Sequence, residues 1–256
     1  MRAFFSILTV IFIVSTITTN RLAADEIIVL AAASLATALD EVIANRVRQT
    51  DMEPTVTVSY GGKGGLSRQI ETGLPAHIFI SANRPWINRL VEKGLLEAAS
   101  VKDILTNRLA LIENINNNSG LKIYPGFPLA QALDNGRLAI GEINSVPAGI
   151  YAKQALQALK SWESVKDKLA PAKDVRAALM LVQRRETELG IVYRTDAKLV
   201  TDIRILDIFD PHLHSPIYYT VAMLTQQNTN LAQSLFDYLT GEIALDIFER
   251  HGFLRP

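Results

Sequence analysis

The sequence predicts an α/β fold built from mainly parallel sheets. Short apolar runs typical of strands alternate regularly with longer runs of helical periodicity, and this order is typical of parallel sheets covered by helices. The same alternation restarts at Arg108, which divides the chain into two stretches of similar design. With 256 residues, 48% of them hydrophobic and 20% charged, the chain can form one large or two small domains with their own cores.

The first stretch holds three predicted strands, each followed by a helix. The continuous apolar run at 26–33 predicts a buried strand, and apolar residues at helical spacing from Leu35 to Val47 predict a helix after it. The β-branched residues at 55–59 predict a second strand, which a glycine-rich loop follows. The remaining elements of this stretch are a helix at 66–71, a strand at 78–81 and a helix at 84–93.

The second stretch repeats this order less regularly. Its predicted strands are 109–112, 138–140, 190–193 and 217–224. Its predicted helices are 129–134, 149–159 and 174–184, followed by one or two helices between 231 and 250.

The first 24 residues have the pattern of a secretory signal peptide. Arg2 precedes an apolar run at 3–17, and a Leu22-Ala23-Ala24 cleavage site precedes Asp25. The apolar run is shorter than the ~20 residues of a membrane-spanning helix, so we expect cleavage rather than anchoring. Removal of this segment leaves 24 basic and 26 acidic residues, a balance that does not indicate a nucleic-acid partner.

The chain contains no cysteine, which excludes disulfides, thiol catalysis, cysteine metal sites and a lipoprotein anchor. An exported protein of this kind is expected to be free in the periplasm.

Two loops have the design of an anion site. Ser34 and the loop "GGKGG" at 61–65 each lie between the carboxyl end of a strand and the start of a helix. Unpaired N–H groups and the positive end of the helix dipole favour anions at such places. Ser34 could also be only a helix cap, which is the commoner role of such a residue.

Other kinds of site receive little support. Lys63 is followed by Gly64, so the glycine loop is not a Walker A loop, and it lacks the glycine order of a dinucleotide loop. His212 and His214 have a spacing that could bind a metal, but no third ligand is evident. There is no G-x-S-x-G elbow for a nucleophilic serine, and we expect neither catalytic residues nor a cofactor.

Several segments resemble the periplasmic molybdate-binding proteins of ABC transporters. The similarity runs in order through the whole chain after residue 24, and three motifs together make it specific. They are "AAASL" at 31–35, "VPAGIYAKQAL" at 146–156 and "GIVY..DA" at 190–197.

The resemblance implies a two-lobed type II periplasmic binding protein. Each lobe would be a mixed, mainly parallel sheet flanked by helices, and the ligand cleft would lie between the lobes. The expected boundaries are residues 25–105 and 219–256 for lobe I, and 106–218 for lobe II.

The family binds molybdate or tungstate with neutral groups from both lobes. By resemblance, Ser34 and Tyr193 would supply hydroxyls, and Ala148 and Val175 would supply backbone N–H groups at helix starts. No metal cation is implied, because the molybdenum would be bound as its oxyanion.

Lys63 departs from the family pattern. It stands where the family's "GSSGAL" loop has its second serine, so the loop loses hydroxyls and gains a charge. One interpretation is that the Lys63 side chain extends to solvent and only the backbone N–H of this residue contributes to the anion site. The other is direct pairing of its ammonium group with the ligand, which would strengthen binding and tolerate anions of other sizes.

The expected function is therefore capture of a tetrahedral oxyanion and its delivery to the permease subunit of an ABC importer, by a monomer. A first alternative is another oxyanion or a small organic anion, which Lys63 would allow. A second is a periplasmic enzyme that uses Lys63 as an amine nucleophile. A third, the sensing domain of a regulator, is disfavoured by the signal peptide.

Overall fold

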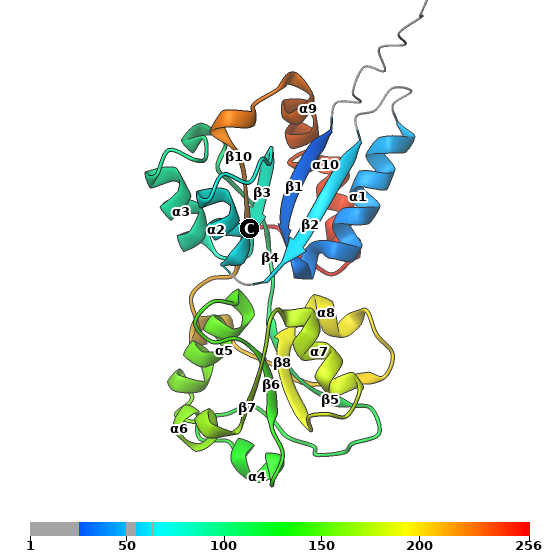
Figure 1. Cartoon of the computed structure of the whole chain (residues 1–256). Helices are drawn as coiled ribbons and strands as arrows, with labels where there is room; N and C mark the ends of the chain where they lie inside the picture. The colour runs from blue at the N-terminus through cyan, green and yellow to red at the C-terminus, as the bar shows by residue number, and fades with distance from the viewer. Residues whose placement is uncertain (1–25, 50–54, 63) are drawn as a thin grey trace, which may run out of the picture.

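The computed structural model describes residues 26–49, 55–62 and 64–256. The chain forms two lobes, one above the other in Figure 1, and each lobe is a five-stranded mixed sheet with helices on both faces. The predicted α/β class with two lobes is confirmed. The signal-peptide segment and Lys63 lie outside the described residues.

The sheet of the first lobe has the strand order β2-β1-β3-β10-β4. Its strands are β1 (Ile27–Ala32), β2 (Val56–Gly61), β3 (Ile78–Ser81), β4 (Lys102–Thr106) and β10 (Tyr218–Met223). Its helices are α1 (Ala36–Arg48), α2 (Gly65–Glu71), α3 (Arg84–Glu92), α9 (Asn230–Leu239) and α10 (Glu242–Arg250).

The sheet of the second lobe has the order β7-β6-β8-β5-β9. Its strands are β5 (Leu109–Asn114), β6 (Leu138–Gly141), β7 (Leu169–Ala172), β8 (Leu189–Tyr193) and β9 (Ile203–Ile208). Its helices are α4 (Leu129–Leu133), α5 (Pro147–Ala158), α6 (Trp162–Val165), α7 (Val175–Gln183) and α8 (Arg194–Lys198).

Burial on both faces explains the continuous apolar sequence of β1. Val29 and Ala31 pack in the core that includes α1 and α10, whereas Leu30 points the other way, into the core formed by α2 and α3. Successive side chains of a strand alternate between faces, so a strand covered on both sides must be apolar at every position.

The sheets contain more antiparallel pairing than the sequence predicted. In the first sheet β1 pairs in parallel with β2 and β3, but β10 is antiparallel to β3 and β4. In the second, β6 is parallel to β7 and β8, but β5 is antiparallel to β8 and β9. Each sheet thus has a parallel half, and the carboxyl ends of both parallel halves face the other lobe (Figure 1).

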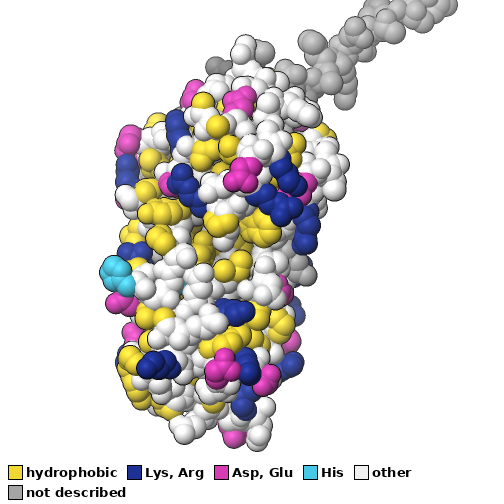
Figure 2. All heavy atoms as spheres, turned by 90° about the vertical axis from the view of Figure 1, so that its left-hand side faces the viewer, with side chains coloured by type: hydrophobic (Ala, Val, Ile, Leu, Met, Phe, Trp, Pro, Cys, Tyr) yellow, Lys and Arg dark blue, Asp and Glu magenta, His cyan; other side chains and the backbone are white. Residues whose placement is uncertain are grey.

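Two segments connect the lobes. The chain passes from β4 to β5 through Asn107 and Arg108, and it returns from β9 to β10 through residues 209–217. On the face shown in Figure 2, acidic and basic side chains are intermixed over both lobes. No helix among the described residues is both long and apolar enough to span a bilayer.

Close packing of α5 on β6 gives a test of the fold. A Cβ atom at Gly149 would lie 2.1 Å from the carbonyl oxygen of Gly141. Gly149→Ala should therefore lower the free energy of unfolding by at least about 1–3 kcal/mol, although alanine at an open helical position would raise it by about 1 kcal/mol. Urea denaturation followed by circular dichroism measures the change, and Gln157→Ala on the exposed face of α5 is the control. A more stable Gly149→Ala protein would contradict this packing.

Candidate functional site

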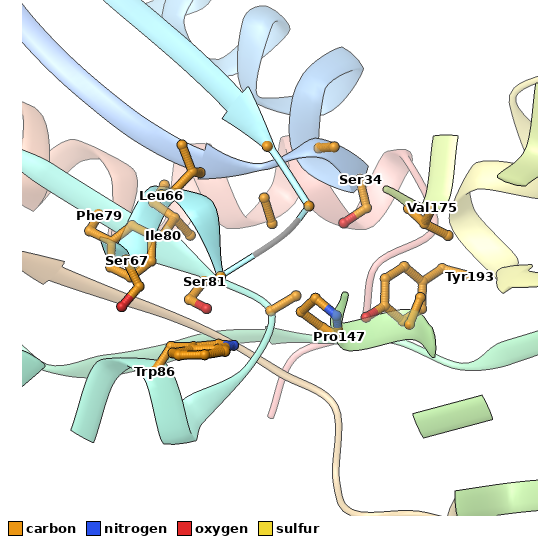
Figure 3. A pocket seen from close by; sticks show the side chains of 17 residues that line it. Ser34, Leu66, Ser67, Phe79, Ile80, Ser81, Trp86, Pro147, Val175 and Tyr193 are labelled. Carbon is orange, nitrogen blue, oxygen red and sulfur yellow. The ribbon is translucent and has the colours of Figure 1, made fainter. Parts of the chain in front are cut away.

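A cavity lies where the two lobes meet. Both lobes contribute to its wall, and Figure 3 shows Ser34, Val175 and Tyr193 grouped at one end, with Ser67 and Trp86 at the other. The lining residues are Ala32, Ala33, Ser34, Gly61, Gly62, Gly64, Leu66, Ser67, Phe79, Ile80, Ser81, Ala82, Trp86, Pro147, Ala148, Val175 and Tyr193. All of these described lining residues are electrically neutral at pH 7.

Strand ends bring the lining residues together. In the first lobe, β1 ends just before Ser34, β2 ends at Gly61 and β3 ends at Ser81. In the second lobe, β8 ends at Tyr193. Ligands of α/β sheets bind outside the carboxyl ends of parallel strands, and here two such edges face one cavity.

Two helices of the second lobe begin at the cavity wall. Helix α5 starts with Pro147, which has no N–H, so Ala148 carries the first N–H of the helix. Helix α7 starts at Val175, and its N-cap Asp174 accepts a hydrogen bond from the N–H of Ala177 at 2.8 Å. The N–H of Val175 thus remains free of its helix at the positive end of the dipole.

The hydroxyl of Tyr193 is buried without a partner among the described residues. The side chain is 1% exposed and lines the cavity. Burial raises the pKa of the Tyr193 hydroxyl well above its usual value, so the group keeps its proton and can donate it in a hydrogen bond. A buried unpaired hydroxyl is costly, so this one is available to donate a hydrogen bond to a molecule in the cavity.

Ser34 does not cap a helix, which excludes the commoner of its two predicted roles. It lies inside a short 3₁₀ helix, Ala33–Leu35, that has no side-chain cap. A hydrogen bond of 2.8 Å joins its hydroxyl to that of Tyr219, and Asn107 Nδ2 donates to the same Tyr219 oxygen. This network fixes the Ser34 side chain at the cavity wall through a residue that connects the lobes.

The glycine loop touches the opposite lobe directly. A Cβ atom at Gly62 would lie 2.2 Å from the Cβ atom of Asp174, so only glycine allows this approach. The N–H of Gly64 donates to the carbonyl of Ser145 at 3.0 Å. At least one backbone donor of the predicted anion loop is therefore used to hold the lobes together.

The structure places Ser34, Ala148, Val175 and Tyr193 around one cavity, while Lys63 lies outside the described residues. Sequence reasoning missed Ser81, although this residue ends a strand just as the run before Ser34 does. It also missed Ser67, whose buried hydroxyl has no partner among the described residues, and Trp86. Neither Ser67 nor Trp86 lies in a recognisable sequence motif, because the packing of α2 on α3 brings both of them to the cavity.

The histidine pair does not form a metal site with its neighbours. His212 is exposed, whereas His214 is buried, places its Nδ1 2.8 Å from the carbonyl oxygen of Ser215 and packs its ring on Tyr151. Among the described residues no cluster of three or more His, Cys, Asp or Glu side chains could hold a metal ion.

The free space in the cavity is small. The centres of water-sized molecules have about 40 Å³ available. By this measure one water needs about 10–15 Å³, so the cavity has room for a few waters or one small ion. Its neutral donors and its size suit a compact anion better than a sugar or a peptide.

Comparisons with known proteins agree with this geometry. A family model described as bacterial extracellular solute-binding protein matches residues 27–254. The molybdate-binding protein ModA of Escherichia coli strain K12 is 38% identical over 233 residues, which are 90% of each chain. ModA of Haemophilus influenzae is 34% identical over 231 residues, 90% of this chain and 91% of the relative.

A solved structure shares the fold. The periplasmic molybdate-binding protein of Azotobacter vinelandii superposes with a TM-score of 0.75 and 19% identity, covering 90% of this chain and 99% of that one. The resemblance found in the sequence motifs is thus confirmed for family and fold. The chain belongs to the bacterial extracellular solute-binding proteins, within which it is similar to the molybdate-binding proteins.

Proposed function

We propose that this protein captures a tetrahedral oxyanion, molybdate or tungstate, and delivers it to an ABC importer. The observation that carries the proposal is the small cavity between the lobes, whose described lining is uncharged and includes the Tyr193 side chain, with its unpaired hydroxyl, and the helix starts at Ala148 and Val175. Both ModA relatives are named as molybdate-binding proteins, which supports molybdate as the ligand among the possible anions.

Neutral donors can hold a dianion in this place. Hydrogen bonds to a charged group contribute about 1.5–3 kcal/mol each, roughly twice a neutral pair, and helix starts add a favourable dipole. Fixed donors select a ligand by the spacing of its oxygens. We therefore assign ligand contacts to the hydroxyls of Ser34 and Tyr193 and to the N–H groups of Ala148 and Val175, with Lys63 as a fifth contact.

The same cavity favours binding over catalysis. Acid–base chemistry needs a group that titrates near neutral pH, whereas the described lining is uncharged and burial moves the pKa of Tyr193 further away from neutrality. We propose that the protein is not an enzyme and needs no cofactor. Because Lys63 adds a charge to the loop, another oxyanion or a small organic anion is the second candidate ligand.

The remaining parts of the proposal come from the sequence and the family. Residues 1–24 would direct export and be cleaved, leaving a monomer in the periplasm that docks on a membrane permease. We place lobe I at residues 25–105 and 219–256 and lobe II at 106–218, so that closure over the ligand is a movement of one lobe against the other.

Binding of the right anion should stabilise the protein. At a ligand concentration of 100 times Kd, linkage adds about 2.7 kcal/mol to the free energy of unfolding. For a chain of this size the melting temperature should rise by roughly 5–10 °C. A thermal-shift panel of molybdate, tungstate, sulfate, phosphate and chromate measures this. The absence of a shift with all five would count against an oxyanion-binding function.

Tyr193→Phe should weaken molybdate binding about tenfold to a hundredfold, because it removes one hydrogen bond to a charged ligand. The ligand-free protein should be as stable as before or more stable, since the hydroxyl is unpaired in the chain. Calorimetric titration and urea denaturation give the two quantities. Tyr124→Phe, on an exposed side chain, is the control. Unchanged affinity would remove Tyr193 from the site.

Lys63→Ser should weaken binding and sharpen the discrimination between molybdate and sulfate. The ammonium group adds attraction that does not depend on oxygen spacing, whereas the serine restores the family's fixed donor. The measurement is the ratio of the two dissociation constants in both proteins. Equal affinities of wild type and variant for both anions would show that the Lys63 side chain makes no contact.

A further inference from the structure

Arg176 crosses the cleft beside the cavity. It follows Val175 in the first turn of α7, in the second lobe. Its Nη2 atom donates to the backbone carbonyl of Ser34 at 3.3 Å and lies 3.4 Å from the hydroxyl oxygen of Thr37, both in the first lobe. Its Nη1 atom lies 3.5 Å from the same hydroxyl. One guanidinium group thus contacts the residue that carries a proposed ligand hydroxyl.

Asp196 holds the other side of this guanidinium group. It lies in α8 of the second lobe, its side chain is fully buried, and it forms an ion pair with Nε of Arg176. Burial raises the pKa of Asp196 to about 7, and the charge of Arg176 opposes this rise. Both partners belong to the second lobe, so separation of the lobes would not break this ion pair. The pair therefore keeps the planar guanidinium group oriented with its Nη atoms toward the first lobe.

The other hydrogen bonds described here across the cleft join neutral groups. The N–H of Gly64 donates to Ser145, and the hydroxyl of Tyr151 donates to the carbonyl of Ala82 at 3.1 Å. The contact of Arg176 is charge-assisted, which makes it stronger than a neutral bond of the same geometry. It is also adjacent in sequence to Val175, whose N–H is a proposed ligand donor.

We propose that Arg176, positioned by Asp196, is a latch that holds the lobes closed and thereby sets the rate at which the ligand leaves. The proposal rests on the proposed function for its ligand, but the latch itself is a property of the two lobes. Ligand and latch act on the same helical turn. A ligand bound to Ser34 and to the N–H of Val175 would join the same two segments that the guanidinium group of Arg176 joins.

The variants must remove the latch without leaving a buried charge. Arg176→Met with Asp196→Asn removes both charges together, because a lone buried Asp196 would destabilise the fold. Arg176→Lys keeps the charge but loses the fork, so it should restore only part of the effect. Arg184→Met at the end of α7, where the side chain is exposed, is the matched control. Gly62→Ala is the positive control, since its Cβ would keep the lobes apart.

Release is measured by stopped-flow fluorescence with molybdate. Trp86 lines the cavity, and in a Trp162→Phe background it is the single tryptophan of the chain. The double variant should release molybdate about tenfold faster, with little change in the association rate. This factor corresponds to the lower end of the free energy that a hydrogen bond to a charged group contributes. Arg176→Lys should fall between this variant and the wild type, and Arg184→Met should match the wild type.

Closure is measured separately from ligand release. Because the chain has no cysteine, Glu92→Cys and Gln157→Cys place two fluorophores on exposed positions of α3 and α5, one in each lobe. Single-molecule energy transfer then gives the closed fraction with and without molybdate. The latch predicts a smaller closed fraction in the double variant under both conditions.

The two proposals fail in different ways. If no oxyanion changes the fluorescence or the lobe distance of the wild-type protein, the proposed ligand class is overturned. The latch is then still tested by comparing the closed fractions of the wild type and the double variant without ligand. A double variant with the wild-type closed fraction and release rate would overturn the latch, whatever the ligand is.

Discussion

Enclosing an anion in a cavity whose described lining is uncharged is the constraint on which the rest of this structure depends. A dianion that leaves water must receive hydrogen bonds from every side, because the cost of desolvating an ion is high. Free N–H groups are concentrated at helix starts, and helix starts follow the carboxyl ends of parallel strands. Each lobe therefore directs the carboxyl ends of its parallel strands toward the other lobe, and its antiparallel strands carry the connections between the lobes.

Close contact between the lobes follows from the same constraint. A small ion can be bound only by donors that lie a few ångströms apart, so the two lobes must approach until their backbones are in contact. The contact of Gly62 with Asp174 has no room for a Cβ atom, and the Gly64 N–H is used to bind Ser145 across the cleft. The glycines of this loop thus serve the approach of the lobes as much as they serve a ligand.

Sequence patterns predicted the central strands because these are buried on both faces, as the apolar run of β1 is. The strands that the sequence did not predict, β4, β7 and β9, all lie at sheet edges. These edge strands are partly exposed. Charged residues interrupt β4 and β9, and β7 contains Pro171, which an edge tolerates. Within the site, strand–helix junctions predicted the place of Ser34, whereas backbone donors such as those of Ala148 and Val175 have no side-chain signature and came only from the family resemblance.

Ser34 shows why a site residue can be found from the sequence while its contacts cannot. Its position between a strand and a helix fitted a helix cap as well as an anion site, and the local sequence did not separate the two. In the structure its hydroxyl forms a hydrogen bond with Tyr219 of β10, and its carbonyl accepts one from Arg176 of the second lobe. Both contacts depend on residues more than 140 positions away, which no local pattern encodes. Ser34 thus links the cavity wall to the segment that connects the lobes and to the opposite lobe. This position, rather than any charge on Ser34, allows it to couple ligand capture to closure.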